Sequence, residues 1–125
     1  MILQAPPETL KLELNQFLRG SWAALEIVPT FRQKRVDDDY TIEKEDYYVG
    51  VTDTSAPRTI TLPALASVPL WVEYIVKDES GGAGANTMTI DGDGAETIDG
   101  AGTKVINSNY GVFRLLRGET AWFTW

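Results

Sequence analysis

Residues 70–77 have the sequence LWVEYIVK, and the alternation of their side chains predicts a β-strand. One face of this strand is wholly apolar and carries Leu70, Val72, Tyr74 and Val76. The other face carries Trp71 and Ile75 on either side of Glu73, so it is largely apolar too. In a chain of 125 residues, a strand that is apolar on both faces predicts that the second face packs against another subunit.

Similar short runs follow one another from Asp46 to the C-terminus. They are rich in valine, isoleucine, threonine and aromatic residues, and glycine, proline, asparagine or aspartate separates them. Spacings of about 8 to 12 residues leave no room for crossover helices. We therefore expect a mostly β fold, an antiparallel β-sandwich or barrel-like module. Core or subunit packing is predicted for Leu70, Val72, Tyr74, Val76, Ile90, Ile98 and Trp122.

The first 36 residues differ from this pattern and are predicted to form an N-terminal anchoring arm, with the β module over residues 37–125. In residues 8–18, ETLKLELNQFL, the leucines fit both helical spacing and strand alternation, so a short helix and an extended arm both remain open. Contacts to a partner protein are predicted for Leu10, Leu14, Phe17, Leu18 and Trp22. The boundary falls in residues 31–40, FRQKRVDDDY, which we expect to form a solvated turn carrying both charges.

Residues 87–103, TMTIDGDGAETIDGAGT, combine carboxylates and glycines and raise the question of a ligand loop. The spacing fails the calcium EF-loop pattern, and residues 81–89 give only one copy of a calcium-binding nonapeptide that needs stacked copies. Phosphate-loop patterns fail as well. The repeated TIDG instead predicts alternating strands and tight turns, in which Asp-Gly provides the positive φ.

A glycosidase-type pair of acids is the enzymatic alternative for this stretch, and it would draw on Asp91, Asp93, Glu96 and Asp99. Such a pair has to face across a cleft, whereas acids on neighbouring glycine-rich turns are usually turn formers. We therefore expect no enzyme, no cofactor and no metal site.

The composition narrows the function further. There are 18 acidic residues against 11 basic ones, giving a net charge of -7, and this disfavours nucleic-acid binding. The chain has neither histidine nor cysteine, which removes the commonest general base, thiolate metal sites and cysteine nucleophiles. It has neither a signal-peptide pattern nor an apolar run approaching the roughly 18 residues of a membrane helix. We expect a soluble protein made in the cytoplasm, without membrane insertion.

Four segments also carry a likeness to a known group of proteins. They are TITLP (59–63), KDESGGAGAN (77–86), NTMTIDGDGAETIDG (86–100) and the closing hydrophobic hairpin with Gly118 and Trp122. Together, residues 46–125 resemble a β module that recurs in virion proteins of tailed bacteriophages, in tail fibres, tail spikes and other surface appendages. The likeness covers about two thirds of the chain.

The resemblance implies a non-enzymatic, often homotrimeric structural module of a virion, made in the host cytoplasm. We expect a short tail-fibre, spike-type or fibre-attachment component that contacts other virion proteins through its N-terminal segment. Only some 45 residues precede the module, so a long fibre shaft is absent from this sequence. A capsid decoration or head-fibre protein is the first alternative. A module that binds host-surface glycan through Trp71, Tyr47, Tyr48 or Tyr110 is the second.

Overall fold

The computed structural model describes residues 32–125, and this part of the chain contains nine strands and one short 3-10 helix. This content confirms the predicted mostly β fold. In chain order, the elements are β1 (Arg32–Val36), β2 (Tyr40–Thr41), β3 (Asp46–Val51), β4 (Arg58–Thr61), η1 (Leu65–Ser67), β5 (Glu73–Asp78), β6 (Met88–Asp91), β7 (Thr103–Ile106), β8 (Val112–Arg117) and β9 (Trp122–Thr124).

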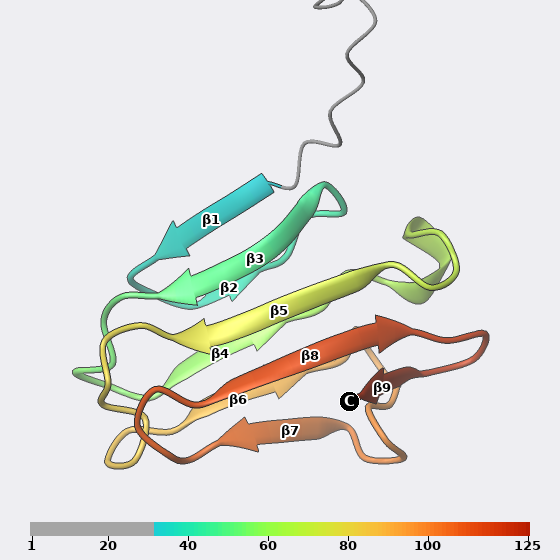
Figure 1. Cartoon of the computed structure of the whole chain (residues 1–125). Helices are drawn as coiled ribbons and strands as arrows, with labels where there is room; N and C mark the ends of the chain where they lie inside the picture. The colour runs from blue at the N-terminus through green and yellow to red at the C-terminus, as the bar shows by residue number, and fades with distance from the viewer. Residues whose placement is uncertain (1–31) are drawn as a thin grey trace, which may run out of the picture. The chain divides into compact units, whose positions relative to one another are not determined.

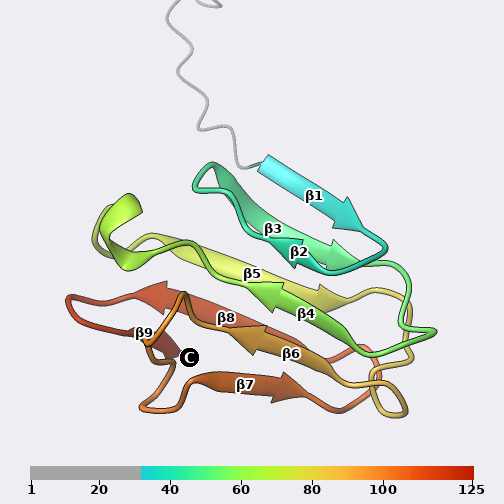
Figure 2. The ribbon, with the colours of Figure 1, turned by 180° about the vertical axis from the view of Figure 1, so that it is seen from behind.

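The strands form two layers, which Figures 1 and 2 show from opposite sides. The five-stranded sheet has the order β1-β3-β5-β8-β9, and the four-stranded sheet has the order β2-β4-β6-β7. The two sheets face each other over a shared hydrophobic core in a sandwich-like arrangement, and neither sheet closes into a barrel.

Both sheets are mixed, which corrects the prediction of an antiparallel fold. From β1 to β6 the chain changes sheet at every strand, so β1, β3 and β5 pair in parallel in one sheet, as do β2, β4 and β6 in the other. A parallel pair needs a crossover connection, and here a strand of the opposite sheet provides it in place of a helix. Only the pairs β5/β8, β6/β7 and β8/β9 are antiparallel.

The core lies between the sheets and is built from alternate residues of their strands. Of the residues predicted for core or subunit packing, five are fully buried, namely Tyr74, Val76, Ile90, Ile98 and Trp122. The rings of Tyr74 and Trp122 lie 5.7 Å apart between centroids, at 46° to each other. Val72 is partly buried and packs against the same cluster. Ile98 belongs to no strand and forms isolated bridges to Ala101 and Trp122, so the second TIDG copy is a turn rather than a strand.

Leu70 does not share this burial. It is 48% exposed and lies in a turn ahead of β5, which begins only at Glu73. The next residue, Trp71, has a φ of 66°, a left-handed conformation that breaks the extended backbone and with it the alternation of faces. The apolar alternation of LWVEYIVK therefore extends further than the strand.

β1 corrects the expectation that residues 31–40 form a turn. RQKRV pairs in parallel with β3, so the sandwich includes residues 32–36, which lie ahead of the predicted boundary at residue 37. The cations of this strand are compensated locally. Arg32 bonds the buried carboxylate of Asp46 at 2.8 Å from Nε, and the Lys34 ammonium lies 5.7 Å from the ring centroid of Tyr40.

The predicted anchoring residues Leu10, Leu14, Phe17, Leu18 and Trp22 lie outside the described residues. Within residues 32–125, no helix has the length and apolar character needed to cross a membrane.

Truncation tests the position of the boundary. A chain that begins at Phe31 retains the nine strands of residues 32–125 and is expected to match the full chain in its urea midpoint. A chain that begins at Asp37 loses β1 and the Arg32 partner of Asp46, so its free energy of unfolding should fall by about 2 kcal/mol or more. Equal stability of the two truncated chains would contradict the assignment of β1 to the folded unit.

Candidate functional site

Five apolar residues and one arginine form an area on the outer face of the five-stranded sheet, here called the outer patch: Ile75, Val112, Arg114, Leu116, Phe123 and Trp125. Leu115 and Trp122 point into the core, so their neighbours on β8 and β9 point outward. Val112 is 48% exposed, Phe123 45% and Trp125 66%. Large apolar side chains that cluster in this way on one sheet face are typical of interaction surfaces.

Arg114 lies within the outer patch, and its charge is already compensated. Its Nε donates to Glu73 Oε2 at 2.9 Å, and its guanidinium carbon lies 4.0 Å from the ring centroid of Trp125. The backbone N–H of Trp125 donates to the Arg114 carbonyl at 3.3 Å, which ties the end of the chain to β8. In the outer patch, Arg114 therefore holds the ring of Trp125, and its ion pair with Glu73 keeps the net charge of the patch small.

A polar cluster continues the same sheet face toward β1. The Arg35 guanidinium lies 5.5 Å from the ring centroid of Tyr48 and bonds Glu79 at 3.3 Å, and the Tyr48 hydroxyl donates to Glu79 as well. Glu79 lies across Gly50, where an added Cβ would come within 2.2 Å of the carboxylate. Burial, and then the hydrogen bond to Glu79, raise the pKa of Tyr48 to about 12. This cluster holds β1, β3 and the end of β5 together.

The outer face of the four-stranded sheet has a different character because it is rich in threonine. Thr41 pairs with Thr61, Thr59 with Thr89, and Asp91 with Thr103. Val105 is the one large apolar residue that is exposed on these strands. The face offers hydroxyl and methyl groups in place of aromatic rings, so the two outer faces are suited to different contacts.

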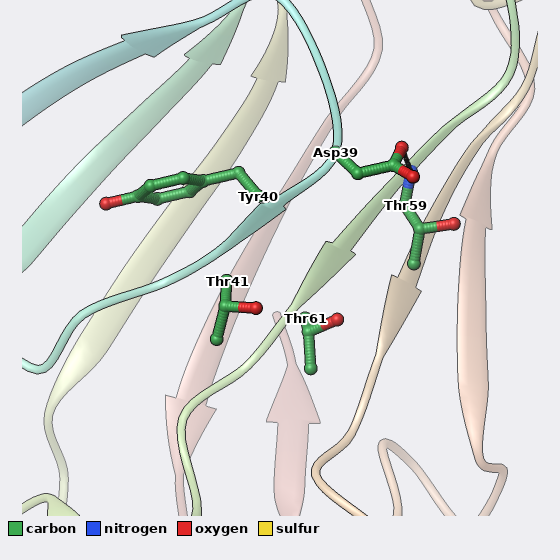
Figure 3. Close-up of a pocket in the computed structure, with 5 residues that line it drawn as sticks. All are labelled: Asp39, Tyr40, Thr41, Thr59 and Thr61. Carbon is green, nitrogen blue, oxygen red and sulfur yellow. Dashed lines mark hydrogen bonds between the residues drawn. The ribbon is translucent and has the colours of Figure 1, made fainter.

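A shallow hollow of about 220 Å³ lies at the β2 end of this face, lined by Asp39, Tyr40, Thr41, Thr59 and Thr61. Figure 3 shows Thr41 beside Thr61, whereas Tyr40 points away from them. The Asp39 carboxylate accepts the Thr59 backbone N–H at 2.8 Å, so it joins β2 to β4. The volume is below the roughly 300 Å³ at which small-molecule pockets begin, and we assign no ligand to this hollow.

Asp78 organises the loops at one end of the sandwich. Its carboxylate is fully buried and accepts five hydrogen bonds, from the backbone N–H groups of Ser80, Gly81, Ala83 and Tyr110 and from the Ser80 hydroxyl, all between 2.9 and 3.0 Å. These donors come from the loop after β5 and from the turn before β8. One buried carboxylate therefore fixes two loops that are far apart in the sequence.

Further bonds extend this network to the loop after β3. The Asn86 side chain donates to the Thr54 carbonyl at 2.9 Å, and the Thr54 and Ser80 hydroxyls contact each other. The loop after β5 also bonds the turn before β8, because the Gly84 N–H donates to Asn109 Oδ1 at 2.9 Å. Hydrogen bonds thus join the three loops at this end of the sandwich.

Two buried aspartates have shifted pKa values, and the causes are similar. Burial alone would raise the pKa of Asp78, but the hydrogen bonds from Ala83, Ser80, Tyr110 and Gly81 outweigh it and lower the pKa below its ordinary value. Burial likewise acts to raise the pKa of Asp46, and donors from Tyr40, Glu43 and Arg32 lower it. Both carboxylates are therefore structural anions.

Two of the four acids named for a glycosidase pair, Glu96 and Asp99, have structural partners. Glu96 accepts the Leu65 N–H at 3.0 Å, which ties the turn after β6 to η1. Asp99 accepts the Thr124 N–H at 3.1 Å and pairs with Lys104 at 3.4 Å. The hydrogen bond from the Thr124 side chain is the main cause that lowers the pKa of Asp99. Within residues 32–125, no group of three or more acidic, histidine or cysteine side chains is placed to hold a metal ion.

The four aromatic residues considered for glycan contact differ in exposure. Trp71 is 60% exposed and Tyr110 is 59% exposed. Tyr47 and Tyr48 are half-buried, and Tyr48 is engaged with Arg35 and Glu79.

Comparisons with known protein families and with curated protein sequences give no match to this chain.

Two features were not predicted from the sequence, the outward position of Phe123 and the buried carboxylate of Asp78. Phe123 was not singled out, although its alternation with the buried Trp122 signals an outward apolar residue. Asp78 was not singled out either. The sequence Asp78-Glu-Ser-Gly-Gly signals an aspartate that bonds the backbone of its own turn, but nothing in it reveals the distant donor Tyr110.

Replacement of Asp78 tests the buried carboxylate. Asp78→Asn places an amide N–H₂ against backbone donors that need an acceptor, so the free energy of unfolding near pH 7 should fall by about 3 kcal/mol or more. The folded-state pKa is lowered, so this stabilisation is fully present above the ordinary aspartate pKa of about 3.9 and is lost as the pH falls below it. Urea unfolding should show the difference from wild type shrinking as the pH is lowered.

Asp93→Asn is the matched control, because Asp93 is exposed in the turn after β6. Its effect should stay within about 0.5 kcal/mol at every pH. If Asp78→Asn matched this control near neutral pH, the carboxylate would not have the role described.

Proposed function

We propose that this chain is a non-enzymatic structural protein of a tailed-phage virion, a short tail-fibre or spike-type component that assembles as a homotrimer through the outer patch. The outer patch carries the assembly part of this proposal. The virion part rests on the resemblance of residues 46–125 to phage surface modules.

The composition of the five-stranded sheet's outer face supports another copy of the chain as the occupant. Around the apolar residues, this face carries the cations Arg35, Lys77 and Arg114 and the anions Glu73 and Glu79. The chain as a whole has a net charge of -7, so two copies repel each other over most of their surface. On this face the positive and negative charges nearly cancel, so electrostatic repulsion between two copies opposes apolar contact less here than elsewhere on the surface.

The side chains in the outer patch suit a stable contact between subunits. Phe123 and Trp125 are large aromatic residues, of the kind that anchor protein interfaces. Phe123 lies against Gly118, where an added Cβ would come within 2.5 Å of the ring, so this ring is already positioned before assembly. A pre-positioned aromatic side chain loses little conformational entropy when it becomes buried.

The roles found for the acidic residues support a non-enzymatic protein. Asp46, Asp78, Glu96 and Asp99 each accept hydrogen bonds that tie loops or strands together. The pKa values of Asp46, Asp78 and Asp99 are lowered, whereas a general acid requires a raised pKa. Among the described residues, these acids serve to hold the fold.

The native mass of the purified chain at micromolar concentration tests the assembly. We expect a trimer for the wild type and a monomer for Phe123→Ser combined with Trp125→Ser, because the outer patch then loses its two largest apolar side chains. Val105→Ser is the matched control, since it removes an exposed apolar residue from the other sheet and should leave the trimer intact.

Two results would contradict the assembly. A monomeric wild type would show that the outer patch does not join copies of this chain, and equal loss of trimer in the control would place the contact elsewhere. Labelled antibody against the chain, applied to phage particles, tests the virion part separately. Tail labelling supports the proposal, whereas labelling spread over the capsid favours a decoration protein.

A further inference from the structure

Tyr110 is an exposed aromatic residue in an unusual backbone conformation. It is 59% exposed and has a φ of 61°, in the left-handed region that residues other than glycine, asparagine and aspartate rarely adopt. Such a conformation is energetically costly, and it persists only where the surroundings enforce it. Neither burial nor helix capping accounts for this tyrosine, because its ring is directed to the surface in the turn before β8.

Three contacts enforce this conformation. The Tyr110 N–H donates to Asp78 Oδ2 at 3.0 Å, and the Lys77 ammonium donates to the Tyr110 carbonyl. The ring lies against Gly81, where an added Cβ would come within 2.4 Å of the ring carbon Cζ. Gly81 itself has a φ of 82°, so both its conformation and its lack of a side chain make room for the ring.

The groups around the ring combine an aromatic surface with free polar atoms. The Gly84 N–H fixes the Asn109 amide by bonding its oxygen, which directs the N–H₂ group away from that contact. Within residues 32–125, neither this N–H₂ group nor the Tyr110 hydroxyl has a hydrogen-bond partner. A fixed ring with adjacent donors matches the apolar C–H face and the peripheral hydroxyls of a pyranose sugar.

We propose that Tyr110, with Asn109 beside it, is a stacking platform for a pyranose ring of a neutral saccharide. The network around Asp78 holds the platform in place before the ligand arrives, which reduces the ordering cost of binding. The net charge of -7 disfavours nucleic acids, the other ligands that stack on exposed aromatic rings. This site lies in the loops, apart from the outer patch, and its role does not depend on trimer assembly.

Titration of the isotopically labelled full chain with three neutral oligosaccharides tests the site: cellohexaose, chitohexaose and a β-linked galactose hexamer. At millimolar concentrations, at least one of them should shift the amide resonances of Tyr110, Gly81 and Asn109. Tyr110→Asn should weaken this binding at least about tenfold, because asparagine accepts the left-handed backbone but removes the ring. Tyr110→Phe should retain affinity within about threefold, since the aromatic face remains.

Trp71→Asn is the matched control. Trp71 is equally exposed and has a similar φ of 66°, but its N–H donates to the Arg117 carbonyl and it lies ahead of the start of β5, whereas Asp78 ends that strand. The Trp71→Asn variant should bind the oligosaccharide as tightly as the wild type. Absence of shifts at Tyr110 with all three sugars, or unchanged affinity in Tyr110→Asn, would overturn the proposal. The native mass of Tyr110→Asn, measured in parallel, should stay that of the wild type, which separates this test from that of assembly.

Discussion

A buried carboxylate has to be surrounded by donors, and this requirement at Asp78 organises much of the molecule. Asp78 ends the central strand of the five-stranded sheet, just before the chain crosses to β6, the last strand of the alternating parallel series. Its five hydrogen bonds fix both the loop that leads to β6 and the turn that starts β8. β8 can then run antiparallel to β5, and β9 pairs with β8 at the edge of the sheet.

The sequence predicted the strands well wherever apolar and β-branched residues alternate. β3 to β9 all lie within or beside the predicted runs, because alternation reflects one buried face. β1 was not predicted because two of its three inward positions are cations: Arg32, which pairs with Asp46, and Lys34, which lies over the ring of Tyr40. Strand direction escaped as well, since a sequence does not reveal that a strand in the opposite sheet replaces a crossover helix.

The candidate surfaces were only partly predictable, for a similar reason. An apolar second face for residues 70–77 was expected, and Ile75 does belong to the outer patch. The larger aromatic residues of that patch, Phe123 and Trp125, come from a strand far along the chain, and only the pairing of β8 with β9 brings them there. Likewise, the exposure of Tyr110 fits its turn sequence, but its support by Gly81 and Asp78 depends on tertiary contacts.

The charged strand β1 has a consequence for how copies of the protein can associate. Among the described residues it forms one edge of the five-stranded sheet, and edge strands offer backbone groups to which further strands can add. Three of its five residues are Arg32, Lys34 and Arg35. A second β1 placed alongside would bring like charges opposite one another. Endless growth of the sheet through this edge is thereby discouraged, which favours closed assemblies of defined size over fibrils.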